Sequence, residues 1–101
     1  MDVFWTPTAL SDLDKIIDYI AERNLVAAIE LHTLIEEKTD LLAHSSLMGR
    51  TGQKKGTREL VVHPHYVVVY DLADVIRILR ILHTSQCRND LYPIVERIGS
   101  D

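Results

Sequence analysis

The sequence predicts an α+β fold in which an N-terminal strand and a two-helix hairpin precede a three-stranded antiparallel meander packed on the helices. Apolar residues recur at helical spacing in the first 45 residues, and three short β-branched runs follow between residues 56 and 83. The turns between those runs are too short for a crossover helix, so neighbouring strands run antiparallel. With 101 residues and 47% hydrophobic content, the chain fits one domain over residues 1–101.

The first strand covers residues 2–5 and ends at Thr6 and Pro7. Thr6 suits a helix N-cap and Pro7 the first helical position, so a helix begins there. Its apolar residues recur every three or four positions, which is typical of an amphipathic helix with one buried stripe. This stripe contains Leu10, Leu13, Ile16, Ile17 and Ile20.

The first helix is expected to end near Arg23 and Asn24, and Asn24 either closes it or caps the next helix. The second helix extends to about Ala43 with its own buried stripe. The members of that stripe are Ala28, Leu31, Leu34, Ile35, Leu41 and Leu42. Together the two helices form a hairpin with an acidic outer surface.

Residues 45–57 contain three glycines and three basic residues but no acidic residue, which predicts a flexible, cationic loop. The loop matches neither a Walker pattern nor a dinucleotide fingerprint, so no cofactor is expected. The meander strands cover residues 56–62, 66–70 and 76–83. Strict alternation along the third strand would place Arg77 and Arg80 on opposite faces.

Both faces of these strands are mainly apolar, whereas one helical hairpin can cover only one face well. Either a partner protein covers the other face, or the C-terminal segment does, through Leu91, Tyr92, Ile94 and Val95. Residues 91–98 could form a short helix or an added strand, and Pro93 leaves that choice open.

The net charge of −4 argues against a general nucleic-acid binder, but the charge is unevenly distributed. Residues 1–45 hold three basic and nine acidic side chains, whereas residues 46–89 hold seven basic and three acidic ones. A local basic field can attract a polyanion even so. Cys87 is the single cysteine, and the N-terminus resembles neither a signal peptide nor a membrane anchor. We therefore expect a cytoplasmic protein without a membrane partner.

Histidines, Cys87 and Arg80 have plain structural interpretations. His63 and His65 flank Pro64 in a turn, and no further ligand is spaced to complete a metal site with them. Cys87 has no pairing that would make it a nucleophile. Arg80, among isoleucines and leucines, is expected to form an ion pair with an acidic residue of the hairpin or of a partner.

The order of these elements, together with three motifs, resembles the RelE/ParE family of toxins from bacterial type II toxin–antitoxin systems. The motifs are Gly49-Arg50, Gly56-Thr57-Arg58-Glu59-Leu60 and Leu82-His83. The resemblance implies a small growth-inhibiting toxin of the kind involved in plasmid stabilisation, held inactive by a cognate antitoxin usually encoded beside it. Operator DNA would be contacted only through that antitoxin.

The family divides by target. RelE-like members are ribosome-dependent endoribonucleases that cut mRNA, and the reaction needs a proton acceptor, cations at the phosphate and an acid for the leaving oxygen. The residues that could supply these groups are Arg58, His63, His65, Arg77, His83 and Tyr92. However, RelE itself has an arginine after the aromatic residue that opens the second meander strand, where this chain has Val67.

ParE-like members instead poison DNA gyrase and have no known catalytic constellation. The Gly-Thr-Arg-Glu-Leu strand entry and the Arg-Ile-Leu-His strand end are closer to this branch. Under this interpretation the target-binding residues are Arg50, Lys54, Lys55 and Arg58, and His83 caps the strand end. Arg58 could equally form a salt bridge, with Asp71 for example. A third hypothesis is a degenerate toxin that only binds an antitoxin or its operator complex.

Overall fold

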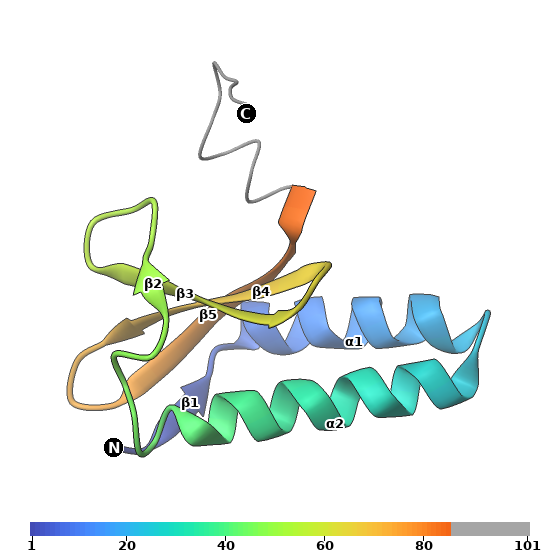
Figure 1. Cartoon of the computed structure of the whole chain (residues 1–101), viewed down its shortest axis with the longest axis horizontal. Helices are drawn as coiled ribbons and strands as arrows, with labels where there is room; N and C mark the ends of the chain where they lie inside the picture. The colour runs from blue at the N-terminus through green and yellow to red at the C-terminus, as the bar shows by residue number, and fades with distance from the viewer. Residues whose placement is uncertain (86–101) are drawn as a thin grey trace.

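The computed structural model describes residues 1–85, which form a five-stranded sheet with two helices on one face (Figure 1). The elements in chain order are β1 (Val3–Trp5), α1 (Pro7–Ala21), α2 (Leu25–Leu41), β2 (Arg50–Thr51), β3 (Thr57–His63), β4 (Tyr66–Leu72) and β5 (Ile76–His83). This arrangement confirms the predicted α+β fold, including the antiparallel meander of β3, β4 and β5. Within the described residues, neither helix is both long and apolar enough to cross a membrane.

Both helices begin at the predicted caps. The Thr6 hydroxyl accepts the Ala9 N–H at 3.2 Å, and the Asn24 side chain accepts the Ala27 N–H at 3.0 Å. These bonds satisfy backbone donors that the first helical turn leaves unpaired. Asn24 is therefore the cap of α2, and α1 already ends at Ala21.

The sheet extends beyond the meander at both edges, in the order β1-β5-β4-β3-β2. β1 is parallel to β5, with Val3 beside Ile76 and Trp5 beside Ile78. At the other edge, Arg50 and Thr51 pair with β3, although the sequence predicted only a flexible loop there. That expectation was wrong for β2 because two residues are too few to produce an alternating pattern.

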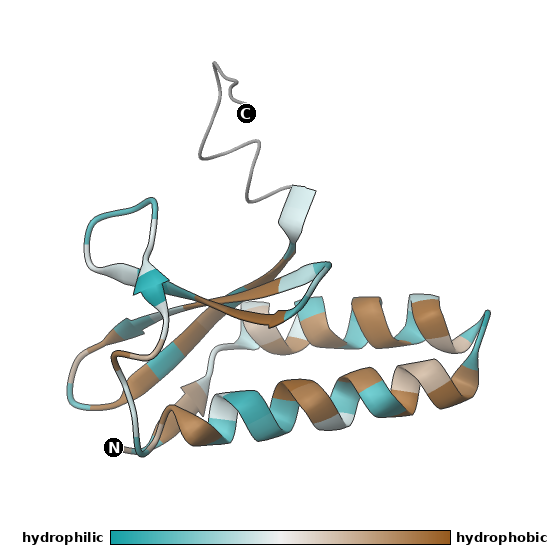
Figure 2. Cartoon of the chain, in the orientation of Figure 1, coloured by the Kyte–Doolittle hydropathy of each residue, from teal (hydrophilic) through white to brown (hydrophobic). Residues whose placement is uncertain are grey.

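The turn from β2 to β3 is closed by its own hydrogen bonds. The Gly52 N–H donates to the Thr57 carbonyl at 2.8 Å, and the Thr57 N–H donates to the Lys54 carbonyl at 3.0 Å. Gly56 has a φ of 85°, which only glycine adopts at little cost. Figure 2 shows this turn as a hydrophilic projection from the sheet, and it carries Lys54 and Lys55 at its tip.

A β-bulge in β5 overturns the predicted faces of this strand. The register passes from Ile78 opposite Tyr70 to Arg80 opposite Val69, so that Leu79 is the additional residue. Directly opposed residues share a face, and Asp71 opposite Arg77 lies on the same side of β4 as Val69. Arg77 and Arg80 therefore share one face, contrary to the prediction from strict alternation.

The hydrophobic core lies between the hairpin and the helix-covered face of the sheet. Its buried members are Ala9, Leu13, Leu31, Ile35, Leu42, Leu60, Val62, Val68, Tyr70, Ile76, Ile78 and Ile81. Leu41 was predicted to belong to the buried stripe but is 50% exposed, because α2 ends there and the chain turns away. The next residue, Leu42, is fully buried instead.

The opposite face, which we call the open face, carries Val61, Val69 and Leu82, and none of its residues belongs to the core cluster. Val61 is 47% exposed, whereas Val67 on the same face is fully buried. Coverage of this face by residues 91–95 was one of two expectations, and that segment lies outside the described residues.

Candidate functional site

The structure divides the candidate catalytic residues between two ends of the sheet. His63 ends β3 and His83 ends β5, whereas Arg58 and Arg77 are the second residues of β3 and β5. Arg58 and His63 are five positions apart, which is about 17 Å along a strand. Arg58 lies opposite Tyr70 in the strand register and so belongs to the helix-covered face. Arg77 lies opposite Asp71 and belongs to the open face. Tyr92 lies outside the described residues.

At the histidine end, four rings form a closed cluster made of His63, His65, Tyr66 and His83. His65 stacks on His83 with ring centroids 5.6 Å apart, and Tyr66 meets His83 edge-on at 5.5 Å. His63 completes the cluster at 5.5 Å from His65 and 5.8 Å from Tyr66. The cluster forms because β3 ends, β4 begins and β5 ends at the same edge of the sheet, and the Thr84 N–H bonds the His65 carbonyl there.

Two of these imidazoles already use one nitrogen. The Nδ1 atom of His63 accepts the His65 N–H, and the Nδ1 atom of His83 accepts the Ser85 N–H, each at 3.1 Å. In the neutral rings the proton is therefore on Nε2. Partial burial lowers the pKa of His63, and the neighbouring His65 lowers it further. His63 is thus held in the neutral form at physiological pH.

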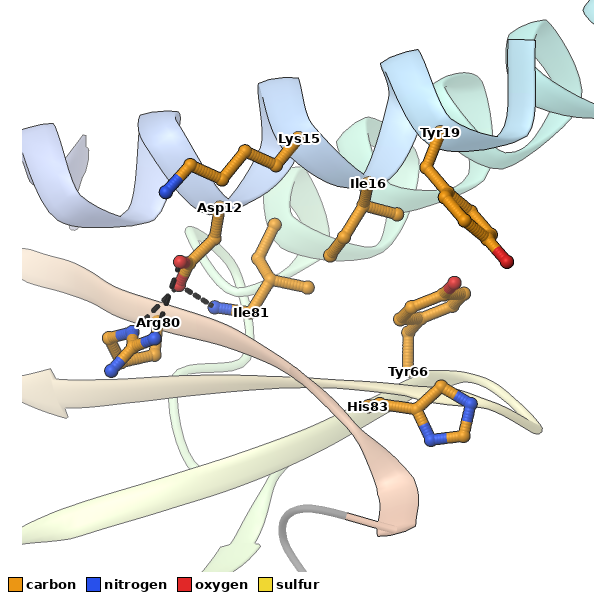
Figure 3. A pocket seen from close by; sticks show the side chains of 8 residues that line it. All are labelled: Asp12, Lys15, Ile16, Tyr19, Tyr66, Arg80, Ile81 and His83. Carbon is orange, nitrogen blue, oxygen red and sulfur yellow. Dashed lines mark hydrogen bonds and ion pairs between the residues drawn. The ribbon is translucent and has the colours of Figure 1, made fainter. Parts of the chain in front are cut away.

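A cleft of about 390 Å³ lies beside this cluster, between α1 and β5 (Figure 3). We call it the α1–β5 cleft, and it is lined by Asp12, Lys15, Ile16, Tyr19, Tyr66, Arg80, Ile81 and His83. The four α1 residues share one helical stripe because they are spaced three and four apart. Burial raises the pKa of Tyr66, with a smaller contribution from Tyr19, so that its hydroxyl remains a donor.

Asp12 joins α1 to the bulged part of β5. Its carboxylate accepts Nε of Arg80 at 2.7 Å, Nη2 of Arg80 at 3.3 Å and the Ile81 N–H at 3.0 Å. This contact confirms the predicted ion pair between Arg80 and an acidic residue of the hairpin. Because a bulge leaves backbone groups out of the regular ladder, a side-chain acceptor here also satisfies a donor of β5.

Two of the arginines that were predicted as functional residues are bound to carboxylates. Arg77 contacts Asp71 through two hydrogen bonds, one of them 2.9 Å long, and this contact raises the pKa of Arg77. Nε of Arg50 lies 3.0 Å from Glu59, whose side chain is only 4% exposed. The local basic field predicted for residues 46–89 is therefore partly cancelled.

Arg58 has a different partner. Its Nη1 donates to the Gly49 carbonyl at 2.7 Å, and Asp71, which was a predicted alternative, is already bound to Arg77. The same segment is held by Tyr70, whose hydroxyl accepts the Gly49 N–H at 2.9 Å and donates to the Ser46 carbonyl at 2.8 Å. The structure thus gives Arg58 a role in fixing the chain before β2.

A second cleft, of about 630 Å³, lies over the open face beneath the β2–β3 turn. Its lining comprises Thr6, Thr8, Gln53, Lys54, Thr57, Glu59, Val69, Leu79, Arg80 and Leu82. Glu59 and Asp12 were not identified as site residues from the sequence, because nothing in a local pattern reveals which arginine a carboxylate will meet. Within residues 1–85, no group of three histidine, cysteine or acidic side chains is arranged to hold a metal ion.

Comparison with known proteins gives consistent matches. Residues 3–87 match the family model described as ParE toxin of the type II toxin–antitoxin system parDE. Toxin RelE2 of Caulobacter vibrioides is 39% identical over 85 residues, which cover 83% of this chain and 96% of that toxin.

Two solved structures resemble the fold. The chromosomal ParDE toxin–antitoxin system of P. aeruginosa contains a chain with a TM-score of 0.73 and 26% identity, covering 82% of this chain and 95% of the other. The E. coli DinJ–YafQ toxin–antitoxin complex contains a chain with a TM-score of 0.55 and 18% identity, covering 84% and 93%. The latter likeness concerns the fold alone.

Proposed function

Since the chain belongs to the RelE/ParE family of toxins of type II toxin–antitoxin systems, we propose that it arrests growth in the ParE manner, by poisoning DNA gyrase. A cognate antitoxin neutralises it, and the similar chain in the chromosomal ParDE toxin–antitoxin system of P. aeruginosa supports such a partner. The match to the ParE family model and the likeness to a ParDE chain support this branch.

The observation that carries the proposal is the separation of the candidate ribonuclease groups. Cleavage by a ribose 2′-hydroxyl requires a proton acceptor and cations around one phosphate, positioned within a few ångströms of each other. Here the imidazoles of His63 and His83 lie at one end of the sheet, and Arg58 lies about 17 Å away along β3. Arg77 is further occupied by Asp71. This arrangement favours a toxin that acts by binding.

The target-binding surface would include the tip of the β2–β3 turn. Lys54 and Lys55 project there and have no ion-pair partner among residues 1–85, in contrast to Arg50. Arg50 and Arg58 support this surface through Glu59 and Gly49.

Controlled expression tests the proposal. Induction of the chain alone should arrest growth and induce the SOS response, and detergent treatment should release gyrase covalently bound to cleaved DNA. Co-expression of the small protein encoded beside this chain should restore growth. Normal growth with full-length protein accumulating, or arrest without gyrase–DNA complexes, would contradict the gyrase proposal.

The second candidate function is a RelE-like endoribonuclease, and the four-ring cluster favours it. A neutral imidazole whose Nδ1 accepts a backbone N–H carries its proton on Nε2, from which it could donate to a leaving oxygen. In that case, primer extension after induction would reveal cuts at fixed positions within codons, and His63→Gln and His83→Gln would abolish them. Intact transcripts during arrest would exclude this alternative.

A further inference from the structure

The α1–β5 cleft contains polar groups that no described residue uses. Lys15 and the hydroxyls of Tyr19 and Tyr66 line it, and within residues 1–85 none of these three groups has a hydrogen-bond or ion-pair partner. Figure 3 shows the two phenols directed toward each other across the cleft, with His83 beside Tyr66. All three unused groups can donate a hydrogen bond, and the lysine is a cation.

The acidic group of the cleft is already satisfied. Asp12 accepts three hydrogen bonds from Arg80 and the Ile81 backbone, and its side chain is only 14% exposed. The polar groups left for a ligand can all donate hydrogen bonds, and Lys15 is a cation, so they match an acceptor such as a carboxylate or a phosphate.

The floor between these donors is apolar. Ile16 packs against the core and Ile81 is 2% exposed, and both line the cleft. Tyr19 forms one wall and remains 58% exposed, although the Arg23 guanidinium lies 3.9 Å from its ring centroid. A matching ligand therefore combines an apolar group for the isoleucines with an acceptor for the tyrosines and the lysine.

The surrounding charge favours a protein over a nucleic acid. The adjoining surface of α1 carries the exposed acids Asp14, Asp18 and Glu22, which would repel the regularly spaced phosphates of a polynucleotide. A protein segment can instead present one carboxylate beside an apolar side chain without bringing further negative charge.

We infer that the α1–β5 cleft is a docking site for the antitoxin, and that it receives a segment in which an apolar side chain is followed by an aspartate or glutamate. The apolar side chain sits on Ile16 and Ile81, and the carboxylate accepts hydrogen bonds from Tyr19, Tyr66 and Lys15. This inference rests on the proposed neutralisation by an antitoxin, but it does not depend on which target the toxin has.

The test uses the full-length chain and, as the probe, the purified neighbouring protein that restores growth in the experiment above. Tyr66→Phe removes only a hydroxyl without an observed partner, and it should weaken binding about tenfold. Lys15→Glu should weaken binding at least as much, because the variant places a carboxylate opposite the ligand's own. Lys15→Glu should still arrest growth, and the antitoxin should rescue it poorly. Tyr66→Phe is judged by its antitoxin affinity alone, because Tyr66 also belongs to the four-ring cluster.

Two α2 variants serve as matched controls. Val26→Ala removes an apolar side chain that is 65% exposed, and Lys38→Glu makes the same charge change as Lys15→Glu at a site outside the cleft. Both should bind the probe as tightly as the unmodified chain. Urea unfolding of all four variants separates loss of binding from loss of folding.

Unchanged antitoxin affinity of Tyr66→Phe and Lys15→Glu, with rescue intact, would overturn the inference while leaving the toxin function standing. If the same two variants instead lose affinity for a single-stranded oligonucleotide and keep antitoxin binding, the cleft is a nucleic-acid site and the inference also fails. Growth arrest that no neighbouring protein relieves would overturn the proposed neutralisation by an antitoxin, and with it the docking inference.

Discussion

At the scale of single residues, Gly49 and Gly56 are glycines for different reasons. A Cβ at Gly49 would lie 2.8 Å from the Glu59 carbonyl and from the ring and hydroxyl of Tyr70. A Cβ at Gly56 would meet nothing within 4 Å, but the φ of 85° strains any other residue.

We expect Gly49→Ala to lower the free energy of unfolding by about 2–3 kcal/mol, because the backbone carbonyl and the buried tyrosine cannot both move away. Gly56→Ala should cost only about 1 kcal/mol. Urea denaturation at neutral pH measures both values, and equal losses would contradict this distinction.

His63 makes stability depend on pH. Its pKa in the folded chain lies below the ordinary value of 6.5, because of burial and of His65. The unfolded chain therefore binds a proton more readily than the folded chain. Protonation begins to stabilise the unfolded state, and so to lower the free energy of unfolding, as the pH falls towards 6.5. Stability should decrease from pH 7.5 to pH 5.5, with the contribution of His63 complete once the pH is below its folded pKa.

His63→Gln should reduce the difference in urea midpoint between these two pH values, since glutamine does not titrate. His44→Gln is a suitable control, because His44 lies after α2, outside the four-ring cluster. If both variants keep the full pH dependence of the unmodified chain, the assignment to His63 is wrong.

At the scale of elements, local signals predicted the helices and the meander. Thr6, Pro7 and Asn24 mark helix starts through bonds within four residues, and the β-branched strands are joined by short turns. Pairing of β1 with β5 joins residues 73 positions apart, and no local pattern reveals such a partner. The bulge at Leu79 was missed for a related reason, since it exists only in the register of two strands.

In the candidate site, too, features set by local sequence could be predicted, whereas features set by long-range pairing could not. His63 and His83 could be identified as proton-transfer candidates from residue type, and their approach at one edge depends on the meander. The partners of Arg50, Arg77 and Arg80 are set by register and by packing of α1 on β5. The sequence therefore revealed which charged groups are present, but not which of them are already paired with a carboxylate and so less able to bind a target.

Asp12 joins α1 to β5 through hydrogen bonds to Arg80 and to the Ile81 backbone, so its substitution should weaken the packing of α1 on β5. Asp12→Ala leaves the Ile81 N–H and the Arg80 guanidinium without this acceptor, and it should destabilise the chain by about 2 kcal/mol. Arg80→Ala should cost less than about 1 kcal/mol, because Arg80 is half exposed and the bond from Ile81 to Asp12 persists.

A double-mutant cycle of these two substitutions checks this asymmetry by chemical denaturation. Equal losses for Arg80→Ala and Asp12→Ala would mean that the ion pair, rather than the backbone bond, holds α1 on the strand.

At the scale of the whole molecule, the helical hairpin carries most of the negative charge and the β2–β3 turn projects two lysines. Substitution of both Lys54 and Lys55 by glutamine should leave stability within about 0.5 kcal/mol, since neither has an ion-pair partner among the described residues. If gyrase is the target, as proposed, the same double variant should weaken gyrase binding roughly tenfold, with a reduced dependence on salt.

Pull-down of gyrase at two salt concentrations measures this effect. Arg50→Gln serves as a contrasting variant, because it leaves the buried Glu59 carboxylate without its cationic partner. It should therefore destabilise the fold, unlike the double lysine variant. Unimpaired gyrase binding by the Lys54 and Lys55 double variant would remove the turn from the target-binding surface.

The position of β5 between β1 and β4 has a consequence for biosynthesis. A polypeptide emerges N-terminal end first, and Val3 through Trp5 must wait for Ile76 through Ile78 before they can pair. Most of the chain therefore has to be translated before the sheet can close around its central strand. A nascent chain truncated before β5 cannot form this sheet, so we expect toxicity only after β5 has been synthesised.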